Sequence, residues 1–386
     1  MLRLLLTVAL VVAFVRSASA AEDTYVVGMT AGLTGPTAST FAPVAEAMRI
    51  YFDRVNAAGG INGKPVKFII LDDQAEPQKA AANVKQLLTW NNAILLIDSS
   101  LSSTFAPVIG EARRADVPLL FIGSVCPKEV YPPADRGQYC TTAFASNFDS
   151  RATLTFIKGT SQDPAQIGFA GATIPVSRAE IDFAEKLATD MGMTAVDKEL
   201  VPPTTADFTP FATKLVAAKP TWVYAWAAWV IQVQLFQAMR RLGWDGNFIG
   251  WAHQEAEDEL KRLKDPHLYV IGANALFQEH LPIQKQIEDA AAEASSRYPA
   301  DQMSEGWIGS MMIEAALQQA GWPANAAKVE ESLQNLKVDM KGMRAAPMEW
   351  TRANHFRVHQ SYRVYNWDAA KGEIVTAKEG LDYEIK

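Results

Sequence analysis

The chain has 386 residues, of which 49% are hydrophobic and 20% are charged, and its formal net charge is −7 at pH 7. An acidic surface repels a phosphate backbone, so this charge argues against nucleic acid as a partner. The length exceeds the ~250–300 residues at which a single hydrophobic core stops growing, and we therefore expect two lobes.

Residues 1–20 have the pattern of a secretory signal peptide. Arg3 precedes an apolar run from Leu4 to Val15, and the small residues Ala18, Ser19 and Ala20 follow. This run is shorter than the ~20 residues of a membrane-spanning helix, and no later segment reaches that length. We expect cleavage after Ala20 and a soluble exported chain. No lipid anchor is expected, because no cysteine comes directly after the leader to carry one.

Strand and helix signals alternate along the next part of the chain. The expected strands cover residues 24–30, 66–72, 93–98 and 117–123, and the expected helices cover 41–57, 77–90 and 103–115. Such alternation predicts a parallel sheet with helices packed on both faces, because each crossover must return a helix to the sheet. The first lobe is therefore predicted to be α/β.

The two cysteines of the chain enclose an irregular segment. Between Cys126 and Cys140 lie three prolines and a glycine, which interrupt helices and central strands. An even number of cysteines in an exported chain favours a disulfide. Two buried free thiols are the alternative.

A second alternating series and a different tail follow. Strands are expected at 166–172, 221–227 and 247–250, helices at 177–191, 207–218, 230–242, 282–297, 305–320 and 325–336, and an antiparallel hairpin within 356–377. Because no low-complexity linker separates the two series, we expect the lobes to be joined by several crossing strands that form a hinge, with the ligand in the cleft.

Three motifs carry a family resemblance. LTGPTAS from Leu33 to Ser39, NAAGGINGKP from Asn56 to Pro65, and the pair Asp72 and Asp73 before Pro77 resemble the periplasmic leucine/isoleucine/valine-binding proteins, which serve ABC transporters. The similarity extends over nearly all of the chain after the leader. It implies a type I periplasmic binding fold, in which two Rossmann-like lobes close on a ligand like a Venus flytrap.

The resemblance also implies boundaries and partners. The signal peptide occupies residues 1–20, the N-terminal lobe 21–144 plus 276–354, and the C-terminal lobe 145–275 plus 355–386. The expected partners are a small-molecule carboxylate and the permease and ATPase subunits of an ABC importer in the inner membrane. The resemblance implies a monomer in the periplasm without a cofactor.

Two strand ends carry the candidate contacts for a carboxylate. The resemblance places Ser102 and Ser103 at the start of a helix that follows a sheet strand, where hydroxyls and free backbone N–H groups hold anions. Gly123, Ser124 and Val125 follow the next strand, where backbone groups of family members touch the head group of the ligand. Plain helix capping by the two serines is the alternative.

The second lobe departs from the amino-acid binders of this family. Those proteins place a glutamate, which faces the ammonium group of the ligand, at the position that is Ala252 here. Burying an ammonium without an anion is costly, so a ligand without an amine is favoured. The alternative is that Glu255, Glu257 or Asp258 replaces the missing acid.

Aromatic residues are dense near the expected cleft. Candidate contacts for the body of a ligand are Phe41, Pro175, Trp226, Trp229, Trp251 and His253. Tryptophans in a strand alternate between faces, so at least half of them are expected in the core. We predict an aromatic carboxylate of the benzoate or cinnamate type, with a branched-chain amino acid as the alternative.

Motifs of enzymes and metal sites are other features that could indicate a function. The sequence has no Gly-x-Ser-x-Gly elbow, phosphate-binding loop or dinucleotide fingerprint, so no enzyme activity is predicted. His355 and His359 have a spacing that suits metal ligands on a helix, but their segment alternates like a strand. A sensing domain and an unrecognised enzyme are the more distant alternatives.

Overall fold

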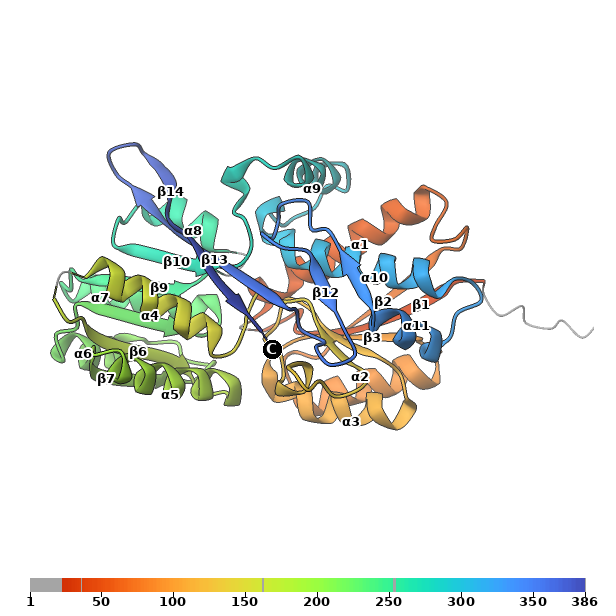
Figure 1. The fold of residues 1–386 in the computed structure, drawn as a ribbon, viewed down its shortest axis with the longest axis horizontal. Helices are drawn as coiled ribbons and strands as arrows, with labels where there is room; N and C mark the ends of the chain where they lie inside the picture. Colours follow the sequence, from red (N-terminus) through yellow and green to blue (C-terminus); the bar gives the residue numbers. More distant parts are fainter. Residues whose placement is uncertain (1–22, 36, 162, 253–254, 386) are drawn as a thin grey trace, which may run out of the picture.

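Two separate sheets with parallel cores organise the molecule (Figure 1). The structure is a computed structural model that describes residues 23–385 apart from 36, 162, 253 and 254. The predicted signal peptide and the candidate His253 lie outside the described residues. No helix in the described ranges has the length and apolar character that a membrane crossing requires.

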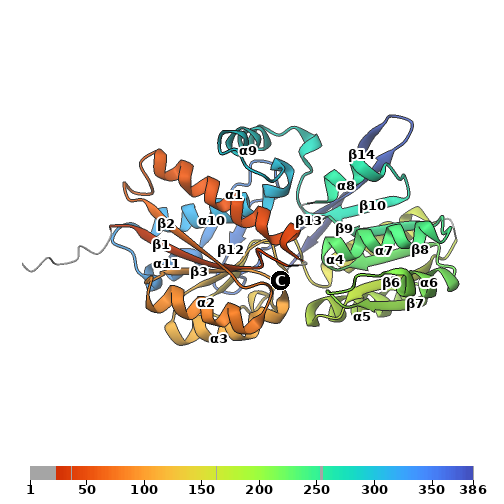
Figure 2. The same cartoon turned by 180° about the vertical axis from the view of Figure 1, so that it is seen from behind.

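The first lobe is built on a parallel five-stranded sheet in the order β2-β1-β3-β4-β5. Its strands are β1 (Tyr25–Ala31), β2 (Val66–Asp72), β3 (Leu95–Ser99), β4 (Leu119–Phe121) and β5 (Gln138–Cys140). Its helices are α1 (Ala38–Ala57), α2 (Pro77–Thr89), α3 (Phe105–Ala115), α9 (Pro282–Glu293), α10 (Ser304–Ala320) and α11 (Ala326–Leu333). α2 and α3 cover one face and α1 and α10 cover the other, each over its own apolar core (Figure 2).

The second lobe contains a seven-stranded sheet in the order β14-β13-β10-β9-β8-β6-β7. Its strands are β6 (Gln166–Ala172), β7 (Thr194–Val201), β8 (Trp222–Trp226), β9 (Asn247–Trp251), β10 (Leu268–Gly272), β13 (His359–Asp368) and β14 (Glu373–Glu384). Its helices are α4 (Phe148–Thr160), α5 (Pro175–Asp190), α6 (Thr209–Ala217), α7 (Trp229–Arg241) and α8 (Ala256–Leu263). The hairpin β13–β14 joins the sheet antiparallel, through β10.

The chain passes between the lobes three times. The crossings follow β5, β10 and β12 (Met348–Trp350), and β12 forms a small antiparallel ribbon with β11 (Leu336–Val338) in the first lobe. The predicted fold class, two α/β lobes with three crossovers, is therefore confirmed. Three crossings restrict relative motion of the lobes to a hinge.

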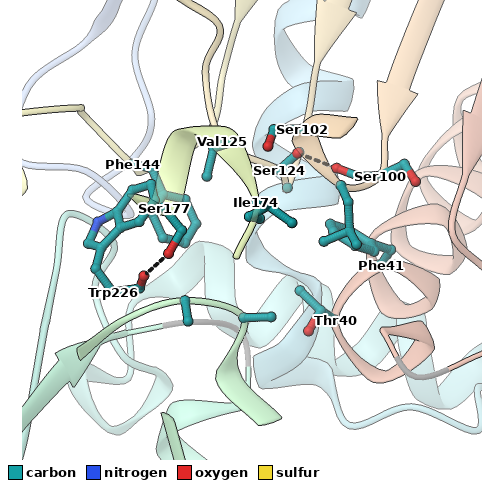
Figure 3. Close-up of a pocket in the computed structure, with 14 residues that line it drawn as sticks. Thr40, Phe41, Ser100, Ser102, Ser124, Val125, Phe144, Ile174, Ser177 and Trp226 are labelled. Carbon is teal, nitrogen blue, oxygen red and sulfur yellow. Dashed lines mark hydrogen bonds between the residues drawn. The ribbon is translucent and has the colours of Figure 1, made fainter. Parts of the chain in front are cut away.

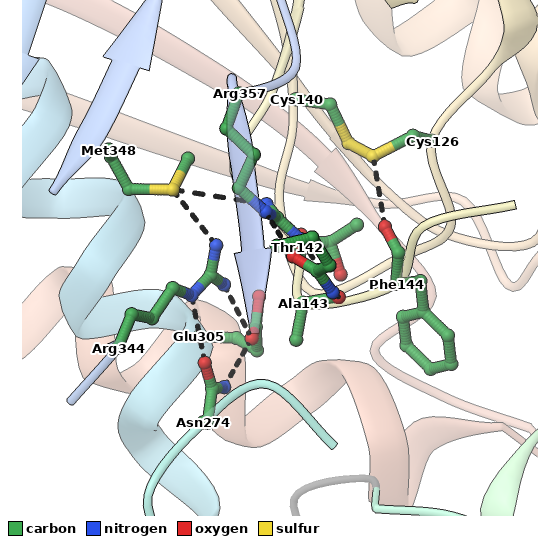
Figure 4. A network of polar contacts seen from close by, with 11 residues as sticks. Cys126, Cys140, Thr142, Ala143, Phe144, Asn274, Glu305, Arg344, Met348 and Arg357 are labelled. Carbon is green, nitrogen blue, oxygen red and sulfur yellow. Dashed lines mark hydrogen bonds and ion pairs between the residues drawn. A yellow bond between two sulfur atoms is a disulfide. The ribbon is translucent and has the colours of Figure 1, made fainter. Parts of the chain in front are cut away.

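Buried polar side chains tie the three crossings together (Figure 4). The guanidinium of Arg357, on the third crossing, donates to the backbone oxygens of Thr142 (2.7 Å) and Ala143 (2.9 Å) on the first. Arg344 donates to Asn274 on the second crossing (2.9 Å) and to Glu305 on α10 (3.1 Å). Burial, together with the positive charge of Arg344, lowers the pKa of Arg357 to about 9. The hinge is thus a packed polar junction.

The cysteines form a disulfide beside the first crossing, as predicted. Cys126 and Cys140 are bonded, with a Cα–Cα distance of 5.8 Å. The bond links the segment after β4 to the end of β5, so the carboxyl ends of two neighbouring strands are covalently joined. The alternative of two free thiols is wrong.

Most predicted elements occur, with shifted ends. The predicted strand at 117–123 is paired only over Leu119–Phe121, and the helix predicted from 103 begins with the 3-10 turn η1 (Ser102–Thr104) before α3. The helix predicted to 336 ends at Leu333, because Leu336 begins β11. Four elements of the second lobe (α4, β7, α8 and β10) and three short strands of the first (β5, β11 and β12) were not predicted from the sequence.

Candidate ligand-binding site

A pocket lies between the two lobes, at the carboxyl ends of parallel strands from both sheets (Figure 3). Its hydroxyl-bearing lining residues are Thr40, Ser100, Ser102, Ser124 and Ser177, and its apolar ones are Phe41, Leu101, Val125, Phe144, Ile174, Trp226, Ala227 and Ala228. Gly123 completes the lining. None of the described residues that line this pocket has a charged side chain, so its polarity comes from hydroxyl and backbone groups.

The first lobe contributes the serine-rich wall of the pocket. Register pairing sets Ala31 of β1 opposite both Ser99 of β3 and Asp72 of β2, so the strands end at one edge. Directly after β3, the hydroxyl of Ser100 donates to the buried carboxylate of Asp73 at 2.8 Å. Burial raises the pKa of Asp73. Ser100 therefore anchors the loop that presents Ser102.

Ser102 is the polar group of this wall that has free bonding capacity. It is 9% exposed, and its Oγ has no hydrogen-bond partner within the described part of the chain. It opens the turn η1, which leads directly into α3. An unsatisfied buried hydroxyl costs about 1–3 kcal/mol, and a ligand that bonds to it recovers that cost.

The backbone around Gly123 brings the second strand end close to the same point. Gly123 has φ +67°, and a Cβ there would lie 2.6 Å from a methyl group of Val44 on α1. Only glycine permits this close approach of the loop to the helix. Next to it, the hydroxyl of Ser124 donates to the backbone oxygen of Ser100, which joins the two loops.

The second lobe contributes the aromatic wall. The indole N–H of Trp226 donates to Asp149 at 2.9 Å, and Tyr362 donates to the other oxygen of the same carboxylate at 2.7 Å. Asp149 is fully buried, and this burial, followed by the negative charge of Glu180, raises its pKa. The bond to Asp149 fixes the ring of Trp226, whose edge packs against Phe144 at a centroid distance of 5.5 Å.

The candidate residues predicted from the sequence fall into distinct places. Phe41, Ser102, Gly123, Ser124, Val125 and Trp226 line the pocket together. Ser103 and Pro175 are neighbours of lining residues but do not line the pocket themselves. Trp229 is buried in the core beneath α7, and Trp251 lines a second, adjacent pocket.

Several lining residues were missed by the sequence analysis. Ser100 stands beside the predicted serines, and its place in the same polar run was the available signal. Phe144 and Ile174 follow strand ends in irregular segments where no periodicity marks them. Only the packing of the two lobes brings these residues to one pocket.

The glutamate of the amino-acid binders is replaced by Ala252 here, and another acid, Glu255, lies nearby in the sequence. Ala252 lines the adjacent pocket rather than the serine-lined one. Glu255, three residues on, is buried and accepts a hydrogen bond from Thr40 across the cleft at 3.0 Å. Its Oε2 has no partner among the residues that the structure describes. Burial raises the pKa of Glu255 to about 7.

The two histidines of the tail do not form a site. His355 is buried, stacks on Tyr139 at 4.1 Å and contacts the backbone oxygen of Gln138 through Nδ1. His359 lies exposed on β13, as a strand rather than a helix residue. Within the described ranges, no group of three or more acids, cysteines or histidines is arranged to hold a metal ion.

Two α/β lobes around a hinged pocket define a ligand-binding protein, and comparisons with known proteins agree. Residues 24–373 match the family model described as periplasmic binding protein, and the chain belongs to this family. It is 30% identical to an amino acid binding protein of Pseudomonas aeruginosa over 103 residues, which are 27% of this chain and 28% of that relative. That match therefore spans little more than a quarter of the relative's length.

Solved structures share the fold at low sequence identity. A branched-chain amino acid ABC transporter protein from Thermus thermophilus with bound valine is 14% identical with a TM-score of 0.79, covering 93% of this chain and 96% of that one. A solute-binding protein of an ABC transporter from Rhodopseudomonas palustris BisB5, in complex with 3,4-dihydroxybenzoic acid, is 19% identical with a TM-score of 0.76, covering 94% and 98%. The family and these neighbours are binding proteins rather than enzymes.

Proposed function

We propose that this chain is the substrate-binding protein of an ABC importer, that it captures a small carboxylate between its lobes, and that the ligand is an aromatic acid of the benzoate or cinnamate type. The observation that carries the proposal is the lining of the serine-lined pocket. Its described residues include no charged side chain, and they combine the unpartnered hydroxyl of Ser102 with the aromatic rings of Phe144 and Trp226.

The head group of the ligand is assigned to the first lobe. A carboxylate there accepts a hydrogen bond from the hydroxyl of Ser102 and further bonds from backbone N–H groups near Ser124, at the start of a helix whose dipole favours negative charge. Charge-assisted hydrogen bonds of this kind are stronger than neutral ones. They offset part of the cost of removing the carboxylate from water.

The body of the ligand is assigned to the aromatic wall. A ligand ring that packs against the wall formed by Trp226 and Phe144 buries apolar area, and aromatic pairs contribute about 0.5–1.5 kcal/mol beyond that burial. A buried ammonium would need a carboxylate, and the described lining has none. The solved dihydroxybenzoate complex supports an aromatic acid as a ligand that this fold can hold.

A branched-chain amino acid is the second candidate. The buried carboxyl of Glu255, with one oxygen unbonded by the described residues, lies at Thr40, which lines the same pocket. An ammonium that reached it would find an anion. The valine complex of the structural neighbour supports this alternative.

Export, oligomeric state and lobe boundaries are part of the same proposal. We propose the signal peptide at 1–20, a periplasmic monomer, an N-terminal lobe of 21–144 plus 276–354 and a C-terminal lobe of 145–275 plus 355–386. Closure of these lobes would present one continuous surface to the permease. Ser103 and Trp229 do not line the pocket, so the proposal assigns them no contact with the ligand. Pro175 and His253 stay predictions from the sequence.

A ligand panel on residues 21–386 tests the proposal. Thermal shifts and calorimetric titrations compare benzoates and cinnamates with leucine, valine, dicarboxylates and amides, since a ligand that binds only the folded state must raise its stability. We expect shifts with aromatic acids and none with their amides. Shifts with leucine or valine alone would replace the favoured ligand by the second candidate, and no shift with any acid would overturn the binding proposal.

A further inference from the structure

A second pocket adjoins the serine-lined one behind the ring of Phe144. Phe144 lines both pockets; its ring packs against Trp226 on one side and lies 4.6 Å from the ring of Trp251 on the other. The second pocket is more polar, because Glu257, Asp301 and Glu305 line it together with Trp251. The two pockets are therefore neighbouring compartments of one interlobe cleft, with Phe144 between them.

Buried polar atoms in this second compartment lack bonding partners. Trp251 is 1% exposed and Glu305 is 4% exposed, and within the described ranges neither the indole Nε1 of Trp251 nor Oε2 of Glu305 has a hydrogen-bond partner. Oδ1 of Asp301 also has none among the described residues. Each such group costs about 1–3 kcal/mol when it stays unsatisfied. The compartment thus combines one vacant donor with two vacant acceptors.

The charges of this compartment are largely balanced within the protein. Glu257 pairs with Lys261 at 2.8 Å and accepts hydrogen bonds from the backbone N–H groups of Phe277 and Gln278. Glu305 pairs with Arg344 at 3.1 Å through its other oxygen. Two of the three acids thus have cationic partners. Burial, followed by the negative charges of Asp258 and Glu257, raises the pKa of the third acid, Asp301, to about 7.

A hydroxyl group matches these vacant atoms in donor and acceptor type. It accepts one hydrogen bond, from the indole N–H, and donates one, to a carboxylate oxygen. An ammonium has three donors and no acceptor, and it would leave the indole N–H without a partner. An unsubstituted ring would leave all the vacant atoms unsatisfied.

We propose that the compartment behind Phe144 recognises a hydroxyl on the end of the ligand opposite its carboxylate, so that the protein selects hydroxylated aromatic acids over their unsubstituted parents. This inference rests on the proposed function, because it takes the carboxylate to be held at Ser102. Trp251 then acts as a donor to the hydroxyl, and Asp301 or Glu305 acts as its acceptor. Phe144 separates the recognition of the ring from that of its substituent.

Matched ligands test the inference without changing the protein. Calorimetry measures the affinities of benzoate, 4-hydroxybenzoate and 4-(aminomethyl)benzoate, and of cinnamate and 4-hydroxycinnamate, which reach further. We expect a hydroxylated acid to bind roughly tenfold more tightly than its parent, because two net hydrogen bonds of about 0.5–1.5 kcal/mol each are gained. Equal affinities within both pairs would overturn the inference, and so would tightest binding of the amine.

Two variants test the residue that donates. Trp251→Phe removes the indole N–H and keeps an aromatic ring, and we expect it to reduce the preference for the hydroxyl to roughly two- to threefold while the parent acid binds as before. Trp229→Phe is the matched control. Trp229 is equally buried, and its Nε1 also lacks a partner among the described residues, but it lines neither pocket.

The results separate this inference from the proposed function. If no aromatic acid binds the wild type, the proposed function fails. If aromatic acids bind without regard to the hydroxyl, the proposed function stands and the inference fails. If Trp251→Phe does not fold, as judged by circular dichroism, the ligand series on the wild type alone decides.

Discussion

The two walls of the serine-lined pocket differ in how they are built. On the first lobe, short loops after β3 and β4 bring serine hydroxyls and backbone groups to one point. The buried carboxylate of Asp73 holds Ser100 by a hydrogen bond, and Ser124 bonds to the backbone oxygen of Ser100. On the second lobe, Trp226 presents a ring whose polar edge is bonded to Asp149. One wall is polar with a vacant hydroxyl, and the other is apolar with its polar atom satisfied. The difference indicates that the first lobe reads the head group and the second reads the body.

Breaking the disulfide is expected to have the largest effect, because it fixes the loop that ends the polar wall. The bridge closes a loop with a sequence separation of 14. The double variant Cys126→Ala and Cys140→Ala should lose about 3 kcal/mol of unfolding free energy. Urea unfolding measures this loss. An unchanged midpoint would show that the loop is held by packing alone.

Glu255 of the second lobe accepts a hydrogen bond from Thr40 of the first lobe, and its burial should appear in the pH dependence of stability. Burial raises its pKa from 4.5 to about 7 in the folded protein. Above pH 4.5 the folded state therefore still holds a proton that the unfolded state has lost. The stabilising contribution of this proton is fully present below pH 4.5 and is lost as the pH rises through 7. Between pH 4 and pH 8, the unfolding free energy of the wild type should fall by up to about 3 kcal/mol relative to that of Glu255→Gln.

Urea unfolding at a series of pH values measures this difference. Glu331→Gln is the control, since Glu331 lies exposed on α11 in the first lobe. A parallel pH dependence of wild type and Glu255→Gln would contradict the prediction. Glu255→Gln also sharpens the ligand assignment, because it should weaken leucine binding only if the amino-acid alternative holds.

Replacing the ring of the apolar wall should weaken ligand binding as well as folding, because Trp226 is buried and bonded to Asp149. Trp226→Leu keeps an apolar side chain and removes the flat surface, and we expect about a 30-fold loss of affinity for aromatic acids, near 2 kcal/mol. Trp229→Leu is the control, because Trp229 is equally buried in the same lobe but does not line the pocket. Similar affinity losses in both variants would mean that the ring acts only through stability.

The smallest effect is expected at the head group. Ser102→Ala removes one hydrogen bond to the carboxylate, and the affinity should fall about fivefold, near 1 kcal/mol. Ser103→Ala, which changes a partly exposed neighbour outside the lining, should leave the affinity unchanged. Calorimetric titration measures both. A loss in Ser103→Ala without one in Ser102→Ala would reverse the assignment of the two serines.

The sequence by itself determined the fold class, the succession of most elements and the disulfide. Alternating strands and helices are encoded in local apolar periodicity, and the glycine and proline motifs mark the turns at fixed places. It also pointed to Ser102 and Ser124, because the ends of parallel strands are recognisable one strand at a time. The edge strand β7 was missed because its side chains are mostly half-buried and show no clear apolar alternation. The helices α4 and α8 and the strand β10 of the same lobe were missed as well.

Only the tertiary structure decided which residues of the two lobes meet. Phe144 lies in a crossing segment, and Glu255 and Thr40 are 215 positions apart yet share a hydrogen bond. The tryptophans follow the same rule: Trp226, Trp229 and Trp251 look alike in sequence, but one lines the pocket, one fills the core and one faces the second compartment. Local pattern fixes the face of a strand or helix, whereas the neighbours on that face are set by how the two lobes pack across three crossings.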